Sequence, residues 1–166
     1  MNTRINYRLA SLLRQLPTPR LIYDLGCGGL DDAFTYRALW PAAQIVGLDR
    51  DRNALRHAQR RDPSLLLVEA KLTALPLLPR ADLILIRHPD VDRHPDEWAH
   101  LFASLPALLV SDANVLITTY TAPEFDRVRR WLRDRLLPLP INAATLEAVG
   151  LDGRDRYNGY FKSRGI

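Results

Sequence analysis

Short apolar runs alternate along the chain with longer segments in which apolar residues recur at helical spacing. The runs predict five strands, at residues 21–23, 44–49, 65–68, 82–86 and 114–120. The segments between them predict helices at residues 30–40, 51–61, 95–109 and 123–135. Nearly continuous apolar strands that alternate with amphipathic helices are typical of a parallel sheet covered on both faces. The pattern therefore predicts an α/β fold.

The last thirty residues break this alternation. Residues 144–149 and 156–162 predict two further strands, joined around the pair Asp152-Gly153, which is typical of hairpin turns. We therefore expect a mostly parallel, seven-stranded sheet that ends in an antiparallel C-terminal hairpin.

Residues 1–18 predict a helix that packs against this sheet. Its apolar residues lie at helical spacing, and they are Ile5, Leu9, Leu12, Leu13 and Leu16. The arginines between them resemble those of a transit peptide, but cleavage would expose the sheet that the helix should cover. We expect residues 1–166 to form one domain that includes this helix.

Composition narrows the class of protein. The chain has 166 residues, of which 47% are hydrophobic and 25% charged, the balance of a globular domain. It has one cysteine and no apolar run long enough to span a bilayer, so we expect a cytoplasmic protein. The net charge of +4 comes mainly from arginine. This charge permits a nucleic-acid partner but is explained as well by a solvated surface.

The first predicted strand leads into a glycine-rich turn, Asp24-Leu25-Gly26-Cys27-Gly28-Gly29. Glycine at position 26 allows a sharp turn, and glycine at position 28 lets a ligand approach the backbone closely. The helix after the turn offers unpaired N–H groups to an anion. In an open α/β sheet, this strand-to-helix turn lies at the edge where ligands bind.

An acidic residue, Asp49, ends the second predicted strand. A carboxylate at this place can accept hydrogen bonds from both hydroxyls of a ribose. An alternative role is that of N-cap for the helix predicted from Asp51.

Together, Asp24-Leu25-Gly26-Cys27-Gly28 and Ile45-Val46-Gly47-Leu48-Asp49 resemble motifs I and II of the class I S-adenosylmethionine (SAM)-dependent methyltransferases. The resemblance covers most of the chain, since the terminal hairpin is similar to that family's antiparallel seventh strand. It implies a Rossmann-like methyltransferase fold, with SAM as cofactor. The residues that it assigns to cofactor binding are Asp24, Gly26, Cys27, Gly28, Gly29, Asp49, Arg50, Ala70, Lys71 and Arg87.

Within that resemblance, each position has an implied role. Gly26 and Gly28 would pack against the methionine part of SAM, and Asp24 would orient its amino group or the turn. Asp49 would bind the ribose, with Arg50 beside the adenine. Cys27 would be a small packing residue.

The chain departs from the family pattern at two places. Leu30 stands where the third glycine is usual, with Gly29 one place early. The acid usually found near the adenine after the third strand has no clear counterpart. Glu69 is out of register, so the backbone of Ala70 and Lys71 would hold the adenine. A dinucleotide or flavin is disfavoured, because the third glycine is missing at the spacing that a pyrophosphate requires.

The fourth predicted strand ends in Arg87-His88-Pro89-Asp90. His88 is the first candidate for a catalytic base because its ordinary pKa is near neutral, and Asp90 is the second. Arg87 would line the cofactor or substrate pocket. Alternatively, the segment is only a loop that leads to a helix start at Pro95.

Two further patterns bear on the chemistry. His88, Asp90, Asp92 and His94 alternate and could share one side of an extended segment, as metal ligands would. Acidic loops beside helix starts are common, however, and we assign no metal. The tetrapeptide Asn/Asp-Pro-Pro-Tyr/Phe/Trp of enzymes that methylate amino groups of bases is absent.

These observations predict a SAM-dependent methyltransferase with an unidentified small-molecule or macromolecular acceptor. One alternative is a protein of this fold that binds SAM or a partner without turnover. A second is an RNA-directed methyltransferase, which only the net charge favours.

Overall fold

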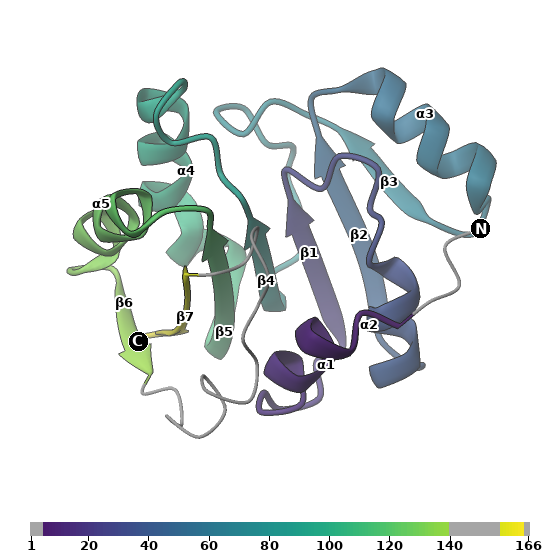
Figure 1. Cartoon of the computed structure of the whole chain (residues 1–166), viewed down its shortest axis with the longest axis horizontal. Coiled ribbons are helices and arrows are strands. Elements are labelled where there is room, and N and C mark those ends of the chain that lie inside the picture. Colours follow the sequence, from purple (N-terminus) through teal and green to yellow (C-terminus); the bar gives the residue numbers. More distant parts are fainter. Residues whose placement is uncertain (1–4, 140–156, 165–166) are drawn as a thin grey trace.

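Seven strands form one sheet in the order β3-β2-β1-β4-β5-β7-β6, with helices on both of its faces (Figure 1). The computed structural model describes residues 5–139 and 157–164. The strands are β1 (Leu21–Leu25), β2 (Gln44–Asp49), β3 (Leu66–Glu69), β4 (Ala81–Arg87), β5 (Leu109–Thr119), β6 (Leu136–Leu139) and β7 (Tyr157–Ser163). The helices are α1 (Tyr7–Leu13), α2 (Ala33–Leu39), α3 (Arg52–Arg61), α4 (Pro95–Leu108) and α5 (Ala122–Leu132).

The sheet is parallel from β3 to β5, and β7 runs antiparallel between β5 and β6. This arrangement confirms the predicted mixed sheet with its antiparallel C-terminal strands. The predicted hairpin partner of β7 needs correction, because the strand paired with its outer side is β6. The strand predicted at 144–149 lies outside the described residues. A proline such as Pro138 disfavours a strand, because it has no N–H to donate to a neighbouring strand. An edge strand such as β6 tolerates proline, because one of its sides needs no ladder hydrogen bonds.

Helix α2 begins at Ala33, three residues later than the sequence predicts. Leu30 takes a left-handed backbone conformation, with φ +47°, which an α-helix cannot include. Asp32 is consequently the N-cap residue, and Asp31 precedes the helix.

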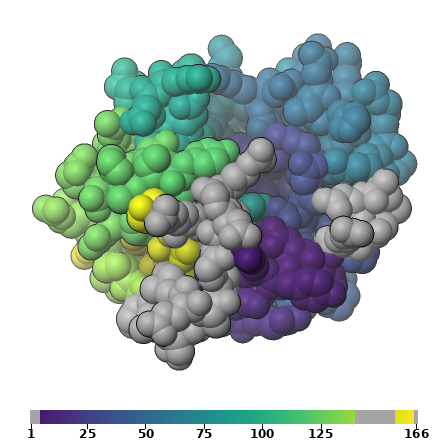
Figure 2. All heavy atoms as spheres, in the orientation of Figure 1, coloured from purple at the N-terminus to yellow at the C-terminus, as the bar shows by residue number. Residues whose placement is uncertain are grey.

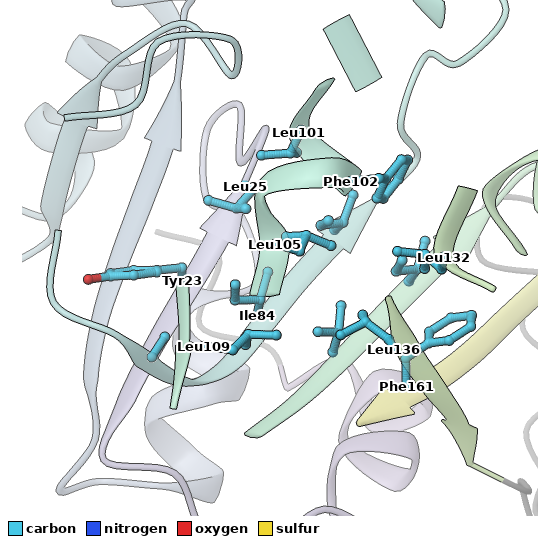
Figure 3. Packing of buried hydrophobic residues seen from close by; sticks show 14 of the residues in the cluster. Tyr23, Leu25, Ile84, Leu101, Phe102, Leu105, Leu109, Leu132, Leu136 and Phe161 are labelled. Atoms are coloured by element: carbon cyan, nitrogen blue, oxygen red, sulfur yellow. The ribbon is translucent and has the colours of Figure 1, made fainter. Parts of the chain in front are cut away.

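Two apolar clusters hold the layers together. One joins the sheet to α4 and α5 through residues such as Tyr23, Ile84 and Phe102, and Figure 3 shows its packing. The other joins the opposite face to the helices at the start of the chain. Leu9, Leu12 and Leu13 of α1 are fully buried there.

Helix α1 is also tied to the far end of the chain. The hydroxyl of Tyr160 in β7 donates to the Leu12 carbonyl at 2.7 Å.

Among the residues that the structure describes, no helix combines the length and apolar character needed to cross a membrane.

Candidate functional site

The ends of β1, β2 and β4 meet at one edge of the sheet, where they surround a cavity of about 150 Å³. This is the edge at which parallel α/β sheets bind their ligands. The cavity is lined by Gly26, Asp49, Arg50, Leu72, His88, Asp90, His94, Glu97 and Trp98. Residues 24–29, 49–50 and 87–90, which the sequence singles out separately, thus lie in one region.

The glycine-rich turn is held by the neighbouring strand. The N–H groups of Gly26 and Cys27 both donate to the Leu48 carbonyl, at 2.8 and 3.1 Å. Gly26 and Gly28 have φ values of +76° and +51°, which glycine adopts at little cost. A Cβ at Gly26 would lie 3.3 Å from Trp98, whereas one at Gly28 would meet nothing within 4 Å. The backbone at Gly28 is therefore open to a ligand.

Asp49 links the end of β2 to this turn. Its Oδ2 accepts a hydrogen bond from the Gly28 N–H at 2.7 Å, and its Oδ1 accepts one from the Asp51 N–H at 2.8 Å. The alternative role as N-cap of α3 is wrong, because Asp51 caps that helix by accepting from Asn53 and Ala54. A carboxylate has about four acceptor positions, so Asp49 keeps capacity for further donors.

Asp24 lies beneath the turn, buried from solvent. Its Oδ2 accepts a hydrogen bond from the Tyr36 hydroxyl at 2.9 Å. Burial raises the pKa of Asp24 to about 6, although the charge of Arg87 and the Tyr36 hydrogen bond act in the opposite direction. Asp24 does not line the cavity, so its contact with the site runs through the turn.

Leu30 and Arg61 shape the second half of the turn. Leu30 keeps its left-handed backbone while its side chain is buried in the core. The guanidinium of Arg61, at the end of α3, donates to the Gly29 carbonyl at 2.6 Å and pairs with Asp31 at 2.6 Å. Arg61 thus contacts the backbone before Leu30 and the side chain of the residue after it.

Cys27 and Gly47 pack against each other where β2 passes behind the turn. A Cβ at Gly47 would lie 2.8 Å from the Cys27 sulfur and 3.0 Å from Leu67. Burial raises the pKa of the Cys27 thiol above its ordinary value. These contacts fit the predicted packing role of Cys27. Gly29 is held from outside by Arg61 and does not line the cavity.

Arg50 spans two sides of the cavity. Its guanidinium pairs with Glu97 at 3.0 Å and lies 3.1 Å from Nε2 of His94. Both partners belong to the start of α4, whose N-cap is His94. The Arg50 and Glu97 side chains are 49% and 41% exposed, so the ion pair is a surface one.

The end of β4 contributes His88 and Asp90 to the cavity lining. His88 has a left-handed backbone with φ +54°, and its N–H donates to the Thr118 carbonyl at 2.9 Å. The His88 ring stacks on Tyr120 with ring centroids 4.5 Å apart. Arg87 points elsewhere: it forms a largely buried ion pair with Asp32 and is not part of the cavity lining.

The segment after β4 does not have the extended form that a set of alternating metal ligands requires. Residues 91–93 form a turn, and Asp92 pairs with Arg127 of α5 at 2.8 Å. Across residues 5–139 and 157–164, no group of three or more His, Cys, Asp or Glu side chains is placed to hold a metal ion.

After β3, the residue that lines the cavity is not one of the two that the sequence predicts beside the adenine. The Ala70 N–H donates to the Asp49 carbonyl at 2.9 Å, and Glu69 pairs with Arg52 at 2.6 Å outside the cavity. Leu72 lines the cavity, whereas Ala70 and Lys71 do not. Sequence reasoning also missed Glu97 and Trp98 as lining residues. The helix after β4 must begin at the same sheet edge, and that rule could have pointed to both.

Comparison with known proteins gives relatives of one chemical class. The chain is 32% identical over 92 residues to trans-aconitate 2-methyltransferase of Rhodopseudomonas palustris (strain BisB5). The aligned region covers 54% of this chain and 36% of the relative. The chain spans about a third or less of the length of the curated relatives it matches. No family model matches the sequence.

Solved structures extend the likeness over nearly the whole chain. N-methyltransferase NodS of Bradyrhizobium japonicum WM9 superposes with a TM-score of 0.68 at 14% identity, covering 95% of this chain and 92% of NodS. The plantazolicin methyltransferase BpumL, solved in complex with S-adenosylhomocysteine (SAH), gives 0.70 at 15% identity, covering 95% and 82%. The chain has the class I SAM-dependent methyltransferase fold.

Arg61 offers a test of how the turn after β1 is held, with SAH, the ligand in the BpumL structure, as the probe. Replacing Arg61 by methionine should weaken SAH binding about tenfold, because charge-assisted hydrogen bonds to the turn are lost. Arg61→Lys should restore part of this loss. Calorimetric titration with SAH measures it, with Arg60→Met, an exposed neighbour on α3, as the matched control. A lower melting temperature with unchanged affinity would contradict a role in positioning the turn.

Proposed function

We propose that this chain binds SAM in the cavity beside Gly26 and transfers its methyl group to an acceptor. The observation that carries the proposal is the hydrogen bond between the Asp49 carboxylate and the Gly28 N–H. It fixes an acid with spare acceptor positions beside an open glycine backbone, at the ligand-binding edge of the sheet. The SAH complex of the similar fold BpumL supports the choice of cofactor.

The residues present fit such a cofactor once Arg50 moves. The cavity of about 150 Å³ is smaller than the roughly 300 Å³ at which drug-sized ligand pockets begin. The Arg50–Glu97 pair that joins its two sides is exposed, and such pairs contribute only about 0–1 kcal/mol. A cofactor can therefore displace Arg50 at small cost. The open space at Gly28 leaves room for its backbone contact.

When bound, SAM would supply a methyl group on its sulfonium sulfur, whose carbon bonds to the acceptor nucleophile as the C–S bond breaks and SAH leaves as a neutral thioether. The residues of the chain then have to align the acceptor and, for a protonated acceptor, remove its proton. His88 is the first candidate for this role, and its support is that it lines the cavity with its ring stacked on Tyr120. Asp90, on the same lining, is the second candidate.

The acceptor class determines whether a base is needed. The curated relatives are named for trans-aconitate, a carboxylate, and carboxylates are already ionised at neutral pH. A hydroxyl or amine acceptor would instead lose a proton to His88 or Asp90. A non-catalytic protein that binds SAM without turnover is the alternative from a different class.

Methyl transfer from labelled SAM tests the proposal. The purified protein is incubated with trans-aconitate, with small hydroxyl and amine acceptors, and with cell extracts with or without RNase. We expect label in a small molecule and no effect of RNase. His88→Asn should spare a carboxylate acceptor but slow a hydroxyl or amine acceptor about 100-fold. Bound SAH without transfer to any acceptor would overturn catalysis and favour the non-catalytic alternative.

A further inference from the structure

A second cavity, of about 340 Å³, lies between the C-terminal half of α5 and the edge of the sheet formed by β6 and β7. Its volume lies within the range of about 300–1,000 Å³ that is usual for small-molecule pockets. Helix α5 follows β5 and lies beside β6 at the left of the sheet in Figure 1. Among the described residues, none that lines this groove also lines the cavity beside Gly26.

The floor of the groove is apolar. It consists of Leu132, Leu136 and Phe161, which are buried, with the exposed ring of Pro138 beside them. Figure 3 places Leu132, Leu136 and Phe161 next to one another at one side of the core. Pro138 lies directly opposite Phe161 in the β6–β7 pairing.

The rim of the groove is cationic. Arg129, Arg130 and Arg133 line it, and Asp126 is the one acid among the described lining residues. Asp126 lies 3.9 Å from Arg129, with both side chains 62% exposed. Arg130 and Arg133 form no ion pair within the described part of the chain. A fourth guanidinium lies close by, because Arg164 donates to the Arg133 carbonyl at 3.2 Å.

The space-filling view shows α5 and β6 side by side at the surface (Figure 2).

An apolar floor under a rim of arginines is complementary to a molecule with an apolar body and an anionic end. Guanidinium groups bind carboxylates through charge-assisted hydrogen bonds, often two at a time. The floor would remove the hydrocarbon part from water.

We propose that the groove between α5 and β6 binds a free, single-chain carboxylate, with its hydrocarbon chain over Pro138 and the accessible edge of Phe161 and its carboxylate between Arg130 and Arg133. This site is separate from the cofactor cavity and does not depend on methyl transfer. Arginines near a helix C-terminus also interact favourably with the helix dipole. The experiment must therefore separate ligand binding from helix stability.

Calorimetric titration of the whole protein with hexanoate, octanoate and decanoate tests the site. Affinity should rise along the series by up to about fourfold for each methylene buried. The double variant Arg130→Gln/Arg133→Gln should bind decanoate at least about tenfold more weakly. Arg14→Gln/Arg60→Gln removes the same charge from exposed positions on α3 and at the end of α1, and should bind decanoate as the unaltered protein does.

Three outcomes would overturn the proposal. One is no saturable binding of decanoate to the unaltered protein. Another is equal affinity for decyltrimethylammonium, which has the same chain with a cationic end. The third is unchanged decanoate affinity in Arg130→Gln/Arg133→Gln, in which case the arginines serve only the helix and its solubility.

Discussion

Replacing Asp49 by alanine should lower the affinity of the protein for SAH by at least about 100-fold. We expect this carboxylate to accept hydrogen bonds from the two ribose hydroxyls, and each hydrogen bond to a charged group contributes roughly 1.5–3 kcal/mol. The substitution also leaves the Gly28 N–H without its partner at 2.7 Å, which loosens the turn. Calorimetric titration of both proteins with SAH measures the effect.

Asp51→Asn is the matched control for this experiment. Asp51 carries the same charge two residues away, and asparagine is as good an N-cap as aspartate, so α3 should keep its cap. Its SAH affinity should stay within about twofold of the unaltered protein. If Asp49→Ala and Asp51→Asn bind SAH equally well, the carboxylate of Asp49 does not contact the cofactor.

Replacing Asp24 by asparagine should raise the free energy of unfolding at pH 7 by about 3 kcal/mol. Burial raises the pKa of Asp24 to about 6 in the folded protein, against an ordinary value of 3.8. Between these two values the folded state holds a proton that the unfolded state has released, so stability falls as pH rises. The cost of ionising Asp24 is complete above pH 6 and absent below about pH 4.

An asparagine at position 24 carries no charge and still accepts the hydrogen bond from the Tyr36 hydroxyl. Urea unfolding of both proteins at pH 4, 5, 6 and 7 should therefore show a gain that grows with pH and is absent at pH 4. A variant that is less stable at pH 7, or equally stabilised at pH 4 and 7, would contradict a strained, ionised Asp24. A residue that lowers stability at such a turn is typical of a functional site.

Much of the fold could be predicted because its elements depend on local patterns. Strand β2 has the bounds that its apolar run predicts, ending at Asp49. Strand β6 could not be predicted in this way, because Pro138 is tolerated only through its place at the sheet edge. The start of α2 was missed because leucine rarely adopts the left-handed conformation that Leu30 has here.

In the site as well, features that depend on local sequence could be predicted, and features that depend on contacts between distant segments could not. The turn and Asp49 could be predicted, because each follows a strand whose carboxyl end must reach the ligand-binding edge. The direction of Arg50 could not, because His94 and Glu97, which draw it across the cavity, come from a helix more than forty residues later. The pairing of Arg87 with Asp32 likewise joins distant segments. Contacts of this kind depend on the packed structure and leave no local pattern.

A crystal structure of the protein grown with SAH would show directly whether the cofactor binds at the turn after β1. We expect density for the ligand beside Gly26 and Gly28, with the ribose hydroxyls within hydrogen-bond distance of the Asp49 carboxylate and Arg50 moved away from Glu97. Density for SAH at another place, or a cavity still closed by the Arg50–Glu97 pair at saturating SAH, would contradict it.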